Sequence, residues 1–248
     1  MWNESRKNVT KTGKATVDGT EETLTESYET STSDESAILV QNGGTATIDG
    51  ATISKLGGDS SNTENSEFYG VNAGILVTEN STATIKNAQI TTNAKSSNAV
   101  FSTGTNSKIY VSDTTINTTV SGSARGLDAT YGGYIEADNV TIKTLGGSSA
   151  TLATDRGEGT VIAKNQELTG NIEADSISTI VMNLSNSNYT GTINGENTAK
   201  SITLKLDSSS EITLTGDSYI TALETSDTSY SNINFNGYKL YVNGVAIN

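Results

Sequence analysis

Short runs of alternating apolar and polar residues recur along this chain with a period of about 26 residues. One apolar column closes the second run of each unit and consists of Ile48, Ile85, Val111, Ala137 and Ala163. A second column lies five positions later and consists of Ile53, Ile90, Ile116, Ile142 and Leu168. Successive members of both columns are 37, 26, 26 and 26 residues apart. Two columns that stay in phase over several units predict a solenoid of stacked coils rather than a globular core.

Each unit contains three short strand-like runs separated by turns, and alternation places every second residue of a run inside the coil. The inward column of the first run consists of Ile38, Ile75, Val100, Leu127 and Leu152. Another column separates the second run from the third and consists of Gly50, Asn87, Asp113, Asn139 and Asn165. These residues tolerate a left-handed backbone, which a sharp corner between two strands requires. Stacked amides at such a corner can also bond to one another along the axis.

The pattern divides the chain into three parts. Residues 1–33 are polar and rich in Thr and Glu, which predicts a cap or a weak first coil. Residues 34–170 form the regular coils, and the first of these is about 11 residues longer than the others, an excess that we place in a loop at 57–68. Residues 171–248 have a shorter period of about 22 and end in aromatic residues that are expected to cap the core.

Four segments, 59–64, 67–74, 125–133 and 153–160, resemble secreted adhesin-like or carbohydrate-binding β-helix proteins of gut anaerobic bacteria. The three strands per coil, the Asn-rich corner and the variable turns resemble the pectate-lyase-like superfamily. The resemblance covers roughly residues 34–244. It implies an all-β fold, a single-stranded right-handed parallel β-helix (β-solenoid) with about 26 and then about 22 residues per coil. The resemblance also implies a possible chemistry. In related lyases, paired acids bind Ca²⁺, and an Arg or Lys abstracts a proton next to a uronate carboxylate.

Composition excludes several classes of enzyme and partner. The chain has no Cys and no His, so it has no disulfide framework, no Ser-His-Asp triad and no ordinary zinc site. Its formal charge of −13 repels nucleic acid and anionic membrane surfaces, and no apolar run is long enough for membrane insertion.

Met1 is interpreted as the start of a mature fragment without its signal peptide. The Thr, Ser, Asn and Gly content predicts an extracellular or cell-surface location.

A cluster of ionisable groups is predicted on the outward face of the first run, where Asp128 and Asp155 are expected to lie about one coil apart. Four further residues flank them: Arg125, Tyr131, Arg156 and Glu158. The favoured interpretation is a set of structural ion pairs. A second hypothesis is a ligand site in which Asp128 and Asp155 bind Ca²⁺, and a third is catalysis. Because Ca²⁺ takes six to eight oxygen ligands, two acids alone favour the structural interpretation.

Three functions remain open at this stage. The leading hypothesis is a non-catalytic secreted or cell-surface module, an adhesin-like scaffold that binds a polysaccharide or host glycan weakly; no catalytic residue is assigned. The first alternative is a Ca²⁺-dependent polysaccharide lyase or hydrolase that acts on the Asp128/Asp155 face. The second alternative is a self-assembling fibre subunit. An enzyme needs a cleft with long walls, and the 57–68 loop is the one long turn available as a wall.

Overall fold

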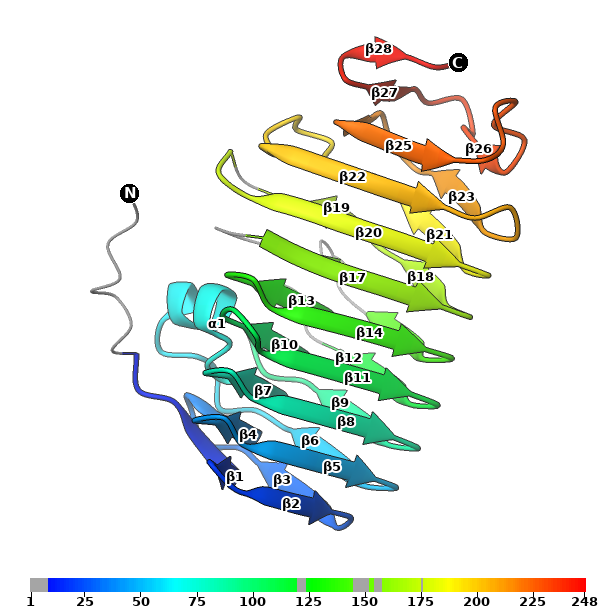
Figure 1. The fold of residues 1–248 in the computed structure, drawn as a ribbon. Coiled ribbons are helices and arrows are strands. Elements are labelled where there is room, and N and C mark those ends of the chain that lie inside the picture. Colours follow the sequence, from blue (N-terminus) through cyan, green and yellow to red (C-terminus); the bar gives the residue numbers. More distant parts are fainter. Residues whose placement is uncertain (1–8, 120–123, 145–151, 154–157, 175) are drawn as a thin grey trace.

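The structure is a computed structural model, and it describes residues 9–119, 124–144, 152–153, 158–174 and 176–248. Within these residues the chain is a parallel β-solenoid with three strands in each regular coil, and its coils stack from the N-terminal to the C-terminal end (Figure 1). The predicted all-β parallel β-helix is therefore confirmed. No helix in the described part of the chain is long and apolar enough to cross a membrane.

Three sheets run along the axis, and each receives one strand from successive coils. The first contains β1 (Thr12–Asp18), β4 (Glu35–Gln41), β7 (Ile75–Thr78), β10 (Val100–Thr103), β13 (Leu127–Thr130), β16 (Leu152–Ala153) and β19 (Ile172–Glu173). The second contains β2 (Glu21–Leu24), β5 (Thr45–Asp49), β8 (Thr82–Lys86), β11 (Lys108–Ser112), β14 (Tyr134–Asp138), β17 (Glu158–Lys164), β20 (Thr179–Ser185), β22 (Ser201–Leu206) and β25 (Ala222–Thr225). The third contains β3 (Ser27–Thr30), β6 (Thr52–Lys55), β9 (Gln89–Thr92), β12 (Thr115–Thr118), β15 (Thr141–Thr144), β18 (Glu167–Thr169), β21 (Asn188–Gly191), β23 (Glu211–Leu214) and β26 (Ile233–Asn234).

The register confirms the predicted apolar columns. Ile85 is the partner of Ile48 in one neighbouring coil and of Val111 in the other. In the third sheet Ile90 is likewise the partner of both Ile53 and Ile116. These side chains are fully buried or nearly so, and they belong to one continuous core. Because burial of such a side chain is worth about 1.5–3 kcal/mol, the stacked columns stabilise every coil that they pass through.

The corner between the second and third sheets has the predicted left-handed backbone. The φ angles are 68° at Gly50, 51° at Asn87, 48° at Asp113 and 53° at both Asn139 and Asn165. The Nδ2 group of Asn139 donates to Oδ1 of Asp113 over 2.7 Å. Asn139 therefore meets the backbone requirement and also links two coils through its side chain, as Asn87 and Asn165 do by donating to Asp49 and Asp138.

The two ends of the solenoid differ. Residues 12–30 form a complete first coil, so the polar N-terminal segment contributes three strands of its own. Toward the other end, Val181 is the partner of Thr203, which confirms the predicted shorter offset of 22 residues. The last elements, β24 (Ser218–Ile220), β27 (Leu240–Val242) and β28 (Val245–Ala246), form a separate sheet in which β27 and β28 pair antiparallel. This hairpin ends the coil stack (Figure 1).

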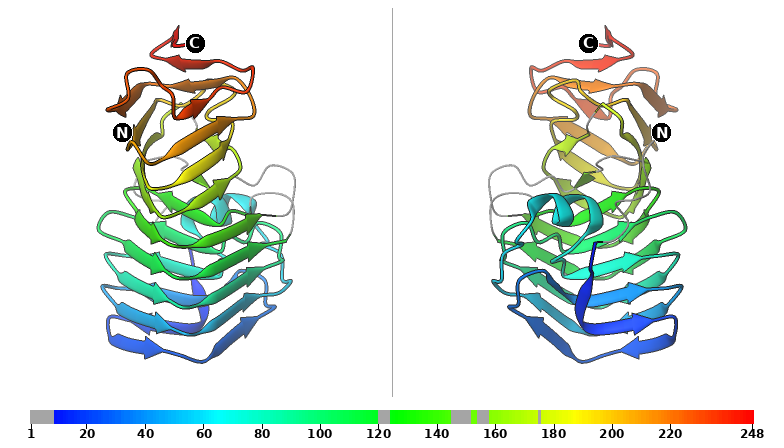
Figure 2. Two further views of the ribbon diagram at one scale, coloured as in Figure 1. Left: turned by 90° about the vertical axis from the view of Figure 1, so that its right-hand side faces the viewer. Right: turned by 90° about the vertical axis from the view of Figure 1, so that its left-hand side faces the viewer.

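The long turn between β6 and β7 contains a short helix, α1 (Thr63–Tyr69), where the sequence predicted a loop. The Asn62 side chain caps its first turn by accepting a hydrogen bond from the backbone N–H of Asn65. Gly70 ends the helix with a left-handed φ of 69°. Figure 2 shows α1 packed against the outside of the coils rather than projecting into solvent.

Candidate functional site

The outer face of the first sheet lies beneath α1. Outward side chains of three successive strands, Leu39, Leu76 and Phe101, form a small hydrophobic cluster with Ala73, and each is at most 1% exposed. This cluster is separate from the core inside the coils. The turn that the sequence suggested as the wall of a cleft therefore covers the face on which the candidate residues were predicted.

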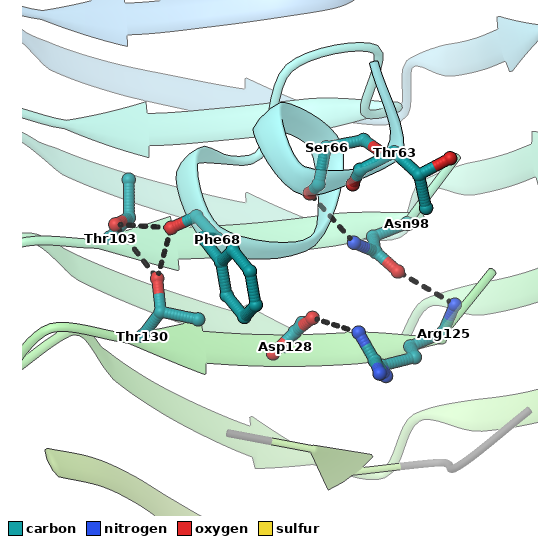
Figure 3. A network of polar contacts seen from close by, with 8 residues as sticks. All are labelled: Thr63, Ser66, Phe68, Asn98, Thr103, Arg125, Asp128 and Thr130. Carbon is teal, nitrogen blue, oxygen red and sulfur yellow. Dashed lines mark hydrogen bonds and ion pairs between the residues drawn. The ribbon is translucent and has the colours of Figure 1, made fainter. Parts of the chain in front are cut away.

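Hydrogen bonds fix α1 to several coils. The carbonyl oxygen of Phe68 lies 3.4 Å from the Thr103 hydroxyl and 3.0 Å from the Thr130 hydroxyl, and both hydroxyls donate to it. The Asn98 amide donates to the carbonyl oxygen of Ser66 over 3.4 Å. Figure 3 shows these contacts, which involve Phe68 in the last turn of the helix and Ser66 at its middle. The helix thus bridges strands that are far from it in sequence.

Asp128 and Arg125 form an ion pair beneath this cover. The Nη1 group of Arg125 is 3.1 Å from Oδ2 of Asp128, and the two side chains are 11% and 1% exposed. The backbone N–H of Arg125 donates to Oδ1 of Asn98, so one amide side chain connects α1 to the turn that carries the arginine (Figure 3). A carboxylate in this environment is held by a charged partner and shielded from bulk solvent.

The other predicted site residues have different positions. Tyr131 has a φ of 50°, and its ring stacks on that of Tyr69 with a centroid distance of 5.6 Å. Glu158 is the first residue of β17 and is the partner of Thr179 in the second sheet. Asp155 and Arg156 lie outside the described residues. The structure therefore brings Arg125 and Asp128 together, and it places Tyr131 against the end of α1.

The proposed Ca²⁺ ligands were Asp128 and Asp155, of which the structure describes the first alone. Asp128 is the register partner of Phe101 on one side and of Ala153 on the other, so neither neighbouring position supplies a second carboxylate. Among the described residues, no group of three or more His, Cys, Asp or Glu side chains is arranged to hold a metal ion. Asp128 instead uses its charge in the contact with Arg125.

Lys55 is a buried cation that the sequence analysis missed. It occupies the inward position at the end of β6 and is fully buried, and its Nζ group donates to the carbonyl oxygen of Thr32 over 2.5 Å. Burial lowers the pKa of Lys55 to about 8, although the carboxylates of Glu35, Asp34 and Asp59 act in the opposite direction. The available signal was its place two residues after the buried Ile53, where an apolar side chain was expected.

A group of outward side chains on the second sheet was also missed. The rings of Tyr110 and Tyr134 are 5.9 Å apart and inclined by 56°. The Tyr134 hydroxyl donates to Oε2 of Glu136 over 2.9 Å, and Lys164 forms an ion pair with the other oxygen of this carboxylate. The bond from Lys164 lowers the pKa of Glu136, whereas burial, followed by the contact with Glu136, raises the pKa of Tyr134 to about 12. At neutral pH, therefore, Tyr134 keeps its proton and Glu136 is ionised.

Within the described residues, the solenoid carries the buried Arg125–Asp128 ion pair on its covered face and the partly exposed rings of Tyr110 and Tyr134 on its second sheet. Comparison with known proteins assigns the chain to none of them: no family model, no curated protein and no solved structure matches it.

Proposed function

We propose that this chain is a non-catalytic β-helix module that acts as an adhesin-like scaffold outside the cell or on the cell surface. The observation that carries the proposal is the position of α1 over the outer face of the first sheet. A polysaccharide lyase or hydrolase that used Asp128 would need an open groove at this position, so that a chain of sugars could reach the carboxylate.

The state of Asp128 supports the same proposal. Its side chain is 1% exposed and contacts Arg125, so neither group is placed to transfer a proton to or from a bound sugar. Removal of one member of a buried ion pair leaves the other partner poorly compensated, which costs about 3–5 kcal/mol. We infer that the pair contributes to the attachment of α1 and to stability rather than to chemistry.

An assay of Asp128→Asn distinguishes the scaffold from the lyase. We expect neither the parent protein nor the variant to release unsaturated products from polygalacturonate or alginate, with or without Ca²⁺. We also expect urea denaturation to show the variant destabilised by about 3 kcal/mol. Glu29→Gln is the matched control, because Glu29 is an exposed acid on β3 and its loss should leave stability unchanged.

Release of product by the parent protein, abolished in Asp128→Asn, would overturn the scaffold proposal in favour of the enzyme. Equal stability of the two proteins would instead remove the structural role that we assign to the ion pair.

A further inference from the structure

The outward residues of the second sheet change in character along the solenoid. In the second and third coils the outward positions of β5 and β8 hold threonines, namely Thr45, Thr47, Thr82 and Thr84. The next two strands place Lys108 and Tyr110, and then Tyr134 and Glu136, at the corresponding positions. Threonine on a strand needs no further explanation, since it suits an exposed pleated surface. Two adjacent tyrosines on the same surface depart from that pattern.

The two tyrosines occupy diagonal positions on neighbouring strands. Tyr110 is the register partner of Glu136, and Lys108 is the register partner of Tyr134. The 56° angle between the rings means that the pair does not stack face to face, and Tyr110 is 38% exposed. By contrast, Tyr219 and Tyr241 near the C-terminal hairpin are almost parallel, at 5°, with centroids 4.7 Å apart. In the Tyr219–Tyr241 pair the ring faces contact each other. In the Tyr110–Tyr134 pair they do not, so ring surface remains available for a ligand.

Charged groups of fixed position border this aromatic surface. Glu136 accepts a hydrogen bond from Tyr134 and pairs with Lys164, and these two contacts hold its carboxylate beside the rings. A carboxylate has about four acceptor positions, so Glu136 retains capacity to accept further hydroxyl donors. The Lys164 ammonium has three donors and is 41% exposed, so it can also bond a ligand hydroxyl.

We propose that Tyr110, Tyr134, Glu136 and Lys164 form a shallow binding site for a neutral oligosaccharide on the outer face of the second sheet. A pyranose ring has an apolar face of C–H groups that packs on an aromatic ring, and equatorial hydroxyls that bond to charged groups at its edge. A flat surface of this kind binds weakly. The ligand is neutral because a protein with a charge of −13 repels an acidic polysaccharide. This inference rests on the adhesin-like function proposed above and names its ligand class and site.

Calorimetric titration with three neutral probes, cellohexaose, xylohexaose and mannohexaose, tests the proposal, with hexagalacturonate as the acidic control. We expect at least one neutral probe to bind and the acidic control to bind less tightly. Tyr110→Thr, which restores the threonine found at this position in the preceding coil, should weaken binding about tenfold. Tyr219→Thr is the matched control, because it removes one ring of the other tyrosine pair and should leave the affinity unchanged.

Tyr134→Phe provides a second test that keeps the ring and removes the bond to Glu136. We expect a smaller loss than for Tyr110→Thr, with an unchanged circular dichroism spectrum. Absence of binding by all three neutral probes would overturn the proposal, as would equal affinities of the parent protein and Tyr110→Thr. The product-release assay described above is independent of these titrations. Lyase activity would therefore overturn the scaffold proposal, whereas failed titrations would overturn this site alone.

Discussion

At the scale of single residues, Asn139 combines a backbone requirement with a side-chain bond. Its φ is 53°, and its amide donates to Asp113 of the preceding coil over 2.7 Å. Asn139→Val should destabilise the protein by about 1–2 kcal/mol, because a β-branched residue is strained in the left-handed region. Asn139→Gly keeps the backbone conformation accessible and loses the amide alone, so it should cost less. Urea denaturation of both variants measures the two contributions, and a stable Asn139→Val would contradict the account of this corner.

Burial of Lys55 should make the free energy of unfolding depend on pH in the alkaline range. Its pKa in the folded state, about 8, lies below the ordinary value of 10.5, so between these values the unfolded chain binds more protons than the folded one. The free energy of unfolding of the parent protein should therefore rise relative to Lys55→Met as the pH increases from about 8 to about 10.5, and the difference should be constant below this window. Urea denaturation across the window measures it.

Lys205→Met is the control for this titration, because Lys205 is 40% exposed and pairs with Glu224 on the surface. A rise that Lys205→Met shares with Lys55→Met would reflect the loss of a lysine charge in general rather than the burial of Lys55. The contradicting result is a difference in free energy of unfolding between the parent protein and Lys55→Met that is the same from about pH 8 to about pH 10.5. That result would mean that Lys55 is not desolvated in the folded state.

At the scale of elements, α1 depends on close approach of its last turn to the sheet below. A side chain at Gly70 would place Cβ 2.5 Å from Cδ1 of Leu76 and 2.6 Å from Cδ1 of Phe101. Gly43 has a similar left-handed backbone, with φ of 75°, and no atom within 4 Å of the same position. Both Gly→Ala variants should carry a backbone cost of about 1 kcal/mol, and Gly70→Ala should add about 1–3 kcal/mol of steric strain. Thermal unfolding compares them, and equal shifts would contradict the tight packing of α1.

The strands and their register could be predicted from sequence because alternation reports directly which residues face inward. Ile85 and Ile90 mark two sheets of one coil by this rule alone, and the left-handed corner follows from Asn and Gly at a fixed spacing. The helix could not be predicted in the same way, since it has seven residues and depends on its caps at Asn62 and Gly70. The hydrogen bonds from Thr103 and Thr130 to Phe68 are long-range and leave no periodic signal.

The candidate site was predicted in part. Arg125 and Asp128 lie close because they are three residues apart at one strand end, whereas the ion pairs expected from the sequence were between residues of adjacent coils. That α1 covers them depends on where the 57–68 segment docks, which the sequence does not report. The Tyr110 and Tyr134 pair was overlooked because the two residues are 24 positions apart and align diagonally rather than in one column.

At the scale of the whole molecule, the strands β1, β2 and β3 end the three sheets within the described residues. Edge strands invite pairing with another chain, and charged side chains on such an edge discourage it. Glu21, Glu22 and Glu29 are exposed on β2 and β3. Replacing all three with Thr should promote self-association, seen as earlier elution in size-exclusion chromatography with light scattering. The fibre alternative would gain support if the parent protein already associated under these conditions.

The control replaces Glu167, Glu173 and Glu211 with Thr. These exposed residues belong to later coils, and their replacement removes the same total charge. If the control variant associates as strongly as the edge variant, net charge rather than edge protection keeps the molecules apart.

The long-range contacts of α1 also affect how the solenoid unfolds locally. In a stack where each coil touches only its neighbours, local unfolding can begin at any coil and spread stepwise. Phe68 contacts Thr103 and Thr130, which are 35 and 62 residues away, so the coils from β4 to β13 share a brace that crosses more than one coil boundary. Their amide protons are expected to exchange with solvent as one cooperative block, and those of β20 to β25 at lower protection. If they do, the insertion converts part of a one-dimensional array into a single unit of unfolding.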